Sequence, residues 1–469
     1  MHDKVVYIVH CIDTEGPLHE SLLGTQQRLK ELFDLDIELN EHILKKLQDS
    51  KINLNGLESS VAKVLSPNLL NYLDTWEGID KVLSLIMSDN FRKILTDSFG
   101  SGWVYNWFCM DHVGFKNNPR GRYLGHHIVF DHYNNILKSS INSDDKIFFH
   151  HHPVGFKRDA HKPTTNYLSF DPLIFKILSR KIIDRMWFPS VYRPGFHVTR
   201  PDSHWFLEQY IPFEYANQSS ESGSDESFQN DSSGGRFGDW RKATTSWVPY
   251  HPSHDDYQKK GSCRRNIARC LNIGTRIRTL TQEDVDKAFY EANEGRNPIL
   301  SFTNHDFRDM TMDLRGIKKQ IKKANDKYPE VLFRYCDSRE AFRLSLNLKK
   351  IEMLDLDIQL KGNKLLVHSN HETFGPQPFL AIKTKKNDYF HDNFDFQEAF
   401  REWTYTFDST NFLIQDIEKI GVSSSDSYGN VCVVVYNEIF IKRGIYFGYK
   451  IGKSKIFNGN VFIFIRIDY

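Results

Sequence analysis

The stretch VYIVHCIDTEGP, residues 6–17, decides the fold. Its β-branched and aromatic residues, followed by a turn signal at Gly16 and Pro17, predict a buried strand that ends near Asp13. Because side chains alternate along a strand, Asp13 and Glu15 point to the same side. Two carboxylates placed so close repel each other unless a cation or a shared proton joins them. The stretch therefore predicts a strand with a candidate site at its C-terminal end.

Strands and helices alternate along the part of the chain that follows. GWVYNWFCMDHVGF (102–115), DKIFFHHHPVGF (145–156) and PILSFTNHDFRDM (298–310) have the composition of strands, and amphipathic helical patterns lie between and after them. Such alternation predicts an α/β fold with parallel strands. In (β/α) barrels the loops at the C-terminal ends of the strands converge over one mouth. We therefore expect such a barrel, with the site at that mouth.

The chain is predicted to form two domains. Residues 1–348 are the barrel domain, and the helical pattern of residues 18–100 is an insertion expected to shape one wall of a pocket. The Ser, Gly and Asp-rich residues 217–238 are expected to form a mobile loop. Over residues 349–469 the pattern changes to alternating strands with tight turns, which predicts an antiparallel, β-sandwich-like domain.

Composition limits the class of partner. The chain has 469 residues, with 61 Lys and Arg against 60 Asp and Glu, so its net charge of +1 gives no argument for nucleic acid as a partner. The six cysteines are scattered without the paired spacing of metal knuckles, which favours a reducing compartment. No apolar stretch is long enough to cross a bilayer, and the N-terminus lacks the pattern of a secretory signal. We therefore expect a cytoplasmic protein.

The histidines of FFHHHPVG, residues 148–155, are candidate metal ligands. On a strand, His150 and His152 lie on one face and His151 on the other, so two of the three are expected to enter one site. A glutamate with two neutral imidazoles is one of the ligand sets of catalytic zinc. A histidine-rich turn is also often structural, so this spacing alone leaves both readings open.

Two further stretches carry candidate catalytic residues. SVYRPGFH, residues 190–197, places Arg193 in a rigid turn, where its charge can keep a carboxylate ionised. SFTNHDFRD, residues 301–309, places His305 at the end of a strand, where it can donate a proton to a leaving group. The structural alternatives are a surface arginine and a packed histidine.

Taken in order, Asp13-Thr-Glu15, His150 to His152, the RPG at Arg193, the Asp239-Trp240 pair and His305 resemble the five motifs of the NodB-homology polysaccharide deacetylases. The resemblance covers roughly residues 5–340 and implies a distorted (β/α) barrel. It implies a divalent metal, with zinc expected, and the following roles: Asp13 as general base, His305 as general acid, Arg193 orienting the base, Asp239 and Trp240 supporting the arginine and lining the pocket, and Glu15, His150 and His152 as metal ligands.

The sequence departs from that family in its metal-ligand spacing. The family usually has adjacent aspartates and a histidine pair four residues apart, whereas here one residue separates Asp13 from Glu15 and the histidines are clustered. Other residues therefore remain candidate ligands, namely Asp111, His112, His132, His151 and His161.

The resemblance implies hydrolysis of an N-acetyl or O-acetyl group on a sugar, and the insertion, the loop and the added β domain look like those of bacterial members associated with surface-polysaccharide assembly. Tyr192, Tyr250 and Trp240 are candidate sugar contacts, although packing explains such aromatic residues equally well. Two alternatives are a glycoside hydrolase on a related barrel and a non-catalytic carbohydrate-binding or scaffolding protein. A polar cluster of the C-terminal domain, His368, His371 and Glu372, is a weaker candidate metal site.

Overall fold

A computed structural model of the protein describes residues 4–140, 144–160, 166–167, 172–221, 238–275, 278–442, 445–457 and 460–464. Most of the expected mobile loop, residues 222–237, lies outside the described residues, as does His161. Among the described residues, no helix is both long and apolar enough to cross a membrane.

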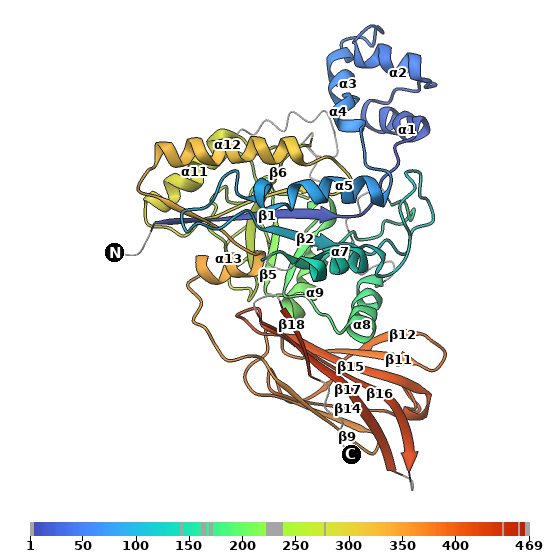
Figure 1. Cartoon of the computed structure of the whole chain (residues 1–469). Coiled ribbons are helices and arrows are strands. Elements are labelled where there is room, and N and C mark those ends of the chain that lie inside the picture. Colours follow the sequence, from blue (N-terminus) through green and yellow to red (C-terminus); the bar gives the residue numbers. More distant parts are fainter. Residues whose placement is uncertain are drawn as a thin grey trace.

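Seven parallel strands close into a barrel (Figure 1). The ring closes because β1 pairs with β2 along one edge and with β7 along the other. An eighth parallel strand, β8, pairs with the N-terminal half of β1. The prediction of a (β/α) barrel is therefore confirmed. The strands are β1 Val5–Thr14, β2 Tyr105–Cys109, β3 Lys146–His151, β4 Val191–Pro194, β5 Phe213–Asn217, β6 Asn266–Asn272, β7 Ile299–His305 and β8 Leu332–Tyr335.

The alternation of β1 divides its side chains between two cores. Ile8 and Ile12 pack outward against the helical layer, whereas Val9 and Cys11 belong to the cluster inside the barrel. Asp13 continues the inward series, so its carboxylate enters the mouth of the barrel. The outer layer contains α7 Ile128–Ser139, α8 Leu173–Arg185, α9 Pro201–Tyr210, α11 Gln282–Asn293 and α12 Thr311–Lys327. The helix α13 Ser338–Ser345 instead packs against the inner cluster through Phe342.

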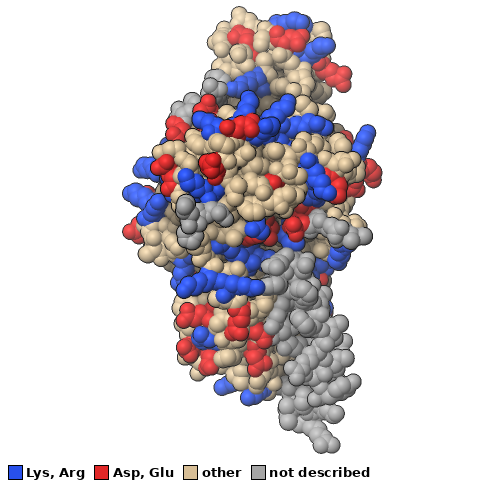
Figure 2. Space-filling model, turned by 60° about the vertical axis from the view of Figure 1, so that its left-hand side comes forward, with Lys and Arg blue, Asp and Glu red and all other residues tan. Residues whose placement is uncertain are grey.

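The segment after β1 is helical, as predicted, and divides into two parts. The first part forms a lobe that stands apart from the barrel in Figures 1 and 2 and has its own apolar cluster around Leu29, Leu47 and Val61. The second part packs on the barrel through residues such as Ile79 and Leu83 of α5. The lobe contains α1 Leu22–Phe33, α2 Glu41–Gln48, α3 Glu58–Val64 and α4 Pro67–Leu70, and α5 Trp76–Ile86 and α6 Asp89–Arg92 follow it.

The C-terminal region contains two antiparallel sheets, as predicted for a β domain. Their inner faces share one apolar cluster, to which Trp403 contributes from one sheet and Ile420 from the other. The four-stranded sheet has the order β13 Asp395–Glu398, β14 Glu402–Thr406, β10 Lys364–Ser369, β9 Leu356–Lys361, and the six-stranded sheet has the order β12 Tyr389–Asp392, β11 Phe379–Thr384, β15 Ile417–Ser425, β16 Val431–Lys442, β17 Ile445–Phe457, β18 Asn460–Phe464.

The β domain rests on the barrel through α8 and α9. Gly421 of β15 lies so close to Ile182 of α8 that a side chain at this position would collide with it. His391 of β12 stacks on Phe175 with ring centroids 4.7 Å apart, and its Nε2 lies 3.2 Å from the Tyr210 hydroxyl. Over the face shown in Figure 2, Lys and Arg lie among Asp and Glu, which agrees with the small net charge.

Candidate metal centre

The turn after β1 is held by a buried aspartate. Asp306 accepts hydrogen bonds from the backbone N–H groups of Glu15 and Gly16, both at 2.9 Å, and from the Tyr133 hydroxyl at 2.9 Å. Gly16 has a positive φ of 71°, which favours glycine. Burial raises the pKa of Asp306 to about 6, although these three donors oppose the rise. The position of Glu15 is thus fixed by groups far away in the sequence.

Glu15, His150 and His152 form a compact group of buried side chains. Their ligand atoms all lie within 4.8 Å of one another. The Nε2 atoms of His150 and His152 are 2.9 Å apart, and Glu15 Oε1 lies 3.8 Å from the first and 3.4 Å from the second. Such a group of one carboxylate and two imidazoles can hold a divalent metal ion.

The hydrogen bonds around the two imidazoles fit a bound cation. His150 Nδ1 lies 2.9 Å from the Arg193 carbonyl oxygen. Because a carbonyl only accepts hydrogen bonds, Nδ1 carries the proton of the neutral ring and Nε2 carries the lone pair. Nδ1 of His152 has no hydrogen-bond partner among the described residues and can carry that ring's proton. Burial lowers the pKa of His152, which keeps the ring neutral. Two lone pairs and a carboxylate then converge on one point, as a metal site requires.

Gly195 explains the shape of the turn beside His152. An added Cβ at Gly195 would lie 2.0 Å from the imidazole ring of His152. A side chain at this position would therefore push His152 out of the group. The glycine of the RPG stretch lets the short helix η1, Gly195–His197, pass directly over the ligand.

Asp13 lies beside this group and is paired with Arg193. The Arg193 Nε donates to Asp13 Oδ1, and Nη2 lies 3.1 Å from Oδ2. Burial opposes ionisation of Asp13, but the charge of Arg193, helped by His150 and His305, outweighs it and lowers the pKa of Asp13. The arginine is itself held by the Tyr215 carbonyl at 3.1 Å. Asp13 is therefore a buried carboxylate that stays ionised and can act as a base.

His305 faces both carboxylates. The register of the sheet places it opposite Asp13, and its Nε2 lies 3.8 Å from Asp13 Oδ2 and 3.8 Å from Glu15 Oε1. Burial lowers the pKa of His305 to about 4, against the opposing effect of the two carboxylates. The structure thus brings together six of the predicted residues, namely Asp13, Glu15, His150, His152, Arg193 and His305.

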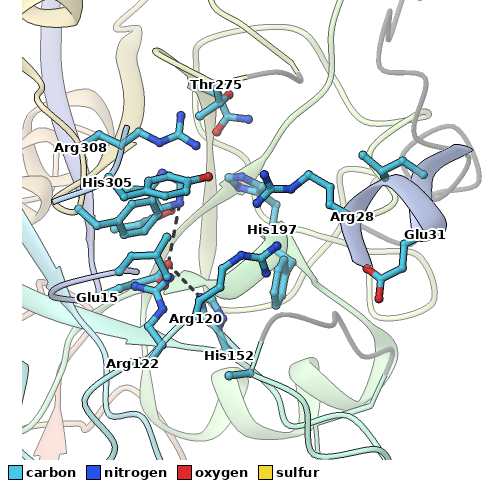
Figure 3. Close-up of a pocket in the computed structure, with 18 residues that line it drawn as sticks. Glu15, Arg28, Glu31, Arg120, Arg122, His152, His197, Thr275, His305 and Arg308 are labelled. Carbon is cyan, nitrogen blue, oxygen red and sulfur yellow. Dashed lines mark ion pairs between the residues drawn. The ribbon is translucent and has the colours of Figure 1, made fainter. Parts of the chain in front are cut away.

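These groups open into a cavity of about 260 Å³ between the barrel mouth and the helical lobe (Figure 3). Asp13, Glu15, His152 and His305 line its floor, and Arg28 and Leu32 of α1 contribute to a wall, as expected for the insertion. Figure 3 shows several arginine side chains pointing into the same space. The cavity is therefore lined by the candidate catalytic groups on one side and by basic groups on others.

The predictions for the four remaining site residues are not supported by their positions. Asp239 pairs with Arg241 rather than with Arg193, and Trp240 is fully buried and donates to the His197 carbonyl at 2.9 Å. Asp239 therefore does not contact the arginine. Trp240 does not line the cavity, but it holds His197, whose Nδ1 accepts a hydrogen bond from Arg193.

Tyr192 and Tyr250 also do not reach the cavity. Tyr192 neighbours Arg193 on β4, so with the arginine pointing inward the tyrosine points outward, where its hydroxyl lies 3.0 Å from that of Tyr167. Tyr250 is buried and donates to the Tyr257 carbonyl at 2.8 Å. Neither is among the described residues that line the cavity, so their positions do not support a role as sugar contacts.

The alternative ligands that the structure describes do not belong to the group of Glu15, His150 and His152. Asp111 forms a buried ion pair with Lys181, at 2.6 Å, on the outer side of the barrel. His112 Nε2 donates to the Glu15 carbonyl at 2.7 Å, and His132 pairs with Asp80 at 2.8 Å. His151 points away from the group, on the same side as Phe149.

Several residues at the site were not predicted from the sequence. Asp306, Arg122 and His197 contact Glu15 or Arg193 directly: the Arg122 guanidinium lies 2.5 Å from Glu15 Oε2, and His197 Nδ1 accepts from Arg193 at 3.1 Å. Burial opposes ionisation of Glu15, but Arg122 and then His152 hold its pKa well below the usual value. Asp306 follows His305 directly, and His197 ends the quoted RPG stretch. Their positions next to these motifs were the sequence signal that could have identified them as site residues.

Comparisons with known proteins find little similarity. No protein-family model and no curated protein matches the chain. A search of solved structures finds a crystal structure of alpha-toxin from an avian strain of Clostridium perfringens, with a TM-score of 0.09 and 16% sequence identity. The match covers 38% of this chain and 55% of the toxin chain, and such a low TM-score carries no argument about fold or function. The resemblance to the polysaccharide deacetylases therefore remains a hypothesis.

Proposed function

We propose that the protein is a metal-dependent carbohydrate deacetylase with a barrel of the polysaccharide deacetylase type. The observation that carries the proposal is the convergence of Glu15, His150 and His152 beside the Asp13–Arg193 pair and His305. These residues come from four separate strand ends, which is hard to explain by packing alone. We place the reaction in surface-polysaccharide synthesis in the cytoplasm.

The ligand group would hold a divalent cation, with zinc as the best candidate for a site of two imidazoles and one carboxylate. Such a cation supplies Lewis-acid activation of water and of the acyl oxygen. Arg122 neutralises the second oxygen of Glu15, and His112 holds the backbone carbonyl of the same residue. These two contacts orient the carboxylate toward the imidazoles.

The reaction is the hydrolysis of an acetamido or acetyl ester group. The oxygen of water attacks the acyl carbon while Asp13 accepts a proton from that water, and the bond to the sugar nitrogen or oxygen breaks. The leaving group needs one proton, which is the proton that Asp13 removed. His305 Nε2 lies 3.8 Å from Asp13 Oδ2 and is placed to carry it. The products are acetate and a free amine or hydroxyl.

The test is acetate release from a panel of N-acetylated and O-acetylated sugars. Protein purified without a metal-affinity tag is assayed after chelation and after reloading with zinc. Loss of activity on chelation, recovery with metal and no activity in Asp13→Asn are expected. Hydrolysis of a glycosidic bond would identify the glycoside hydrolase alternative, and tight sugar binding without turnover would identify the scaffolding alternative.

A further inference from the structure

The cavity above the candidate metal centre carries more arginine than its catalytic carboxylates require. Asp13 is paired with Arg193 and Glu15 with Arg122, so both carboxylates are already compensated by the protein. Any cation held by Glu15, His150 and His152 would therefore add positive charge that the described ligands do not balance. The remaining basic groups at the cavity are Arg28, Arg120 and Arg308.

Arg28 and Arg120 share one carboxylate. Glu20 lies 3.2 Å from Arg28 Nη1 and 2.9 Å from Arg120 Nε, and the three side chains are nearly buried, with exposures of 8% to 12%. Nη1 of Arg28 is buried and its contact with Glu20 lacks hydrogen-bond geometry, while Nη2 donates to the other Glu20 oxygen at 3.2 Å. Two guanidinium groups that share a single carboxylate retain one positive charge and unused donors.

Arg308 stands on another wall of the cavity, in the loop after β7. It donates through Nη1 to the Gly274 carbonyl at 2.5 Å, and it lies over the rings of Tyr72 and Phe307, with distances to the ring centroids of 5.3 and 5.7 Å. Its Nε is buried and makes no hydrogen bond to a described residue. Among the described residues Arg308 forms no ion pair; burial raises the pKa of the nearby Asp313 carboxyl, against the opposing charge of Arg308. The two rings and the Gly274 carbonyl hold the guanidinium in place without a directly paired carboxylate.

The three arginines face one space. Figure 3 shows Arg28 and Arg120 on one side of the cavity and Arg308 on the other, with their guanidinium groups directed inward. Glu31, exposed on α1, is the further carboxylate of the cavity lining. Because guanidinium groups match the geometry of phosphate and carboxylate oxygens, such an arrangement is suited to a small anion.

We infer that the sugar bound in this cavity is anionic: it carries a phosphate ester or a carboxylate, which Arg28, Arg120 and Arg308 bind while the acyl group lies at the metal centre. This inference rests on the proposed function for the identity of the acyl group. The basic residues select the charged sugar, and the strand-end residues perform the hydrolysis. A neutral acetylated sugar would leave the arginines unpaired and would bind more weakly.

The test is calorimetric binding of three probes to the zinc-loaded full chain. N-acetylglucosamine is neutral, N-acetylglucosamine 1-phosphate carries a phosphate ester, and N-acetylglucosaminuronic acid carries a carboxylate. At least one anionic probe is expected to bind about tenfold or more tightly than the neutral sugar, because charge-assisted hydrogen bonds are among the strong ones. The tighter of the two anionic probes identifies which group the arginines prefer.

Arginine variants distinguish the contribution of the arginines to binding from that of the metal centre. Arg308→Gln and Arg28→Gln are each expected to weaken binding of the anionic probe about tenfold, whereas binding of the neutral sugar stays within about twofold. Arg334→Gln, at the other end of the barrel beside Glu340, is the control. Equal affinity for neutral and anionic probes, or unchanged affinity in both variants, would overturn the inference. Arginine-dependent anion binding without acetate release from any probe would instead reject the deacetylase and keep the anionic ligand.

Discussion

Two regions of the chain, the mouth of the barrel and one loop of the β domain, contain both histidine and glutamate, and they behave differently. In the barrel, Glu15, His150 and His152 converge in one buried group. In the β domain, His368 is exposed beside Glu402, and His371 Nε2 lies 3.1 Å from the buried Asp426.

The difference comes from strand direction. Parallel strands place their C-terminal ends at one edge, so residues far apart in the chain meet there. The loop that carries His371 follows an antiparallel strand, and His371 and His368 contact different carboxylates, Asp426 and Glu402. A ligand-rich sequence therefore indicates a metal site when the fold makes its residues converge.

Metal content gives the largest expected difference between the two regions. Glu15→Ala and His152→Ala should each lose the cation, which should be present at about one per chain in the wild-type protein, because each removes one of three ligands. Mass spectrometry of protein prepared without a metal-affinity tag measures this. His368→Ala and His371→Ala should keep the metal, and its loss there would show that the β domain is the metal site.

The next largest effect is expected for catalytic activity, which should depend on the Asp13 carboxylate at the mouth of the barrel. Asp13→Asn removes the base next to the ligand group, and acetate release is expected to fall about 10³-fold while metal content is unchanged. The matched control is Asp357→Asn, which changes an exposed aspartate of β9 in the β domain. Full activity in Asp13→Asn would show that another group takes the proton.

Metal affinity should depend on the turn that carries Glu15. Asp306→Asn keeps one oxygen acceptor but turns an NH₂ group, which is a donor, toward one of the two backbone N–H groups. Glu15 should therefore shift, and metal affinity should fall about 10-fold to 100-fold. Competition with a chelating dye measures the affinity. Asp426→Asn changes a carboxylate that likewise accepts backbone N–H groups, in the β domain, and should leave metal affinity unchanged.

The contact between barrel and β domain should give the smallest effect, which is pH-dependent. His391 Nδ1 donates to the Leu380 carbonyl, and burial lowers the pKa of His391 to about 4. Because the unfolded chain binds the proton more readily, this histidine favours unfolding as the pH falls below about 6.5. Between pH 7.5 and 5.5 it should lower the free energy of unfolding by about 1 kcal/mol.

Thermal or denaturant unfolding of His391→Gln at both pH values checks this. The variant should lose less stability on acidification than the wild-type protein. His254→Gln, which changes an exposed histidine, should lose as much as the wild-type protein. Equal acid sensitivity of His391→Gln and the wild-type protein would show that His391 is not responsible.

The sequence predicted the barrel and those candidate residues whose positions follow from strand geometry. Asp13, His150 and His305 lie at strand ends, where alternation and direction determine which way a side chain points. The same rule places Tyr192 outside, since it neighbours the inward Arg193. Trp240 and Tyr250 could not be placed in this way, because irregular segments have no fixed period. Arg28 reaches the cavity through the tertiary position of the lobe, which no local pattern encodes.

The pairing of β1 has a consequence for how the protein folds. Gly16 and Asp306 are 290 residues apart, and β1 needs both β7 and β8 as neighbours. During synthesis the first strand therefore leaves the ribosome long before its partner strands exist, and its apolar residues stay unpaired with them until β7 and β8 are made. Such distant pairing makes barrel closure a late and slow event. A chain that stops before β7 lacks His305 and Asp306, so the candidate site is completed only when the ring closes.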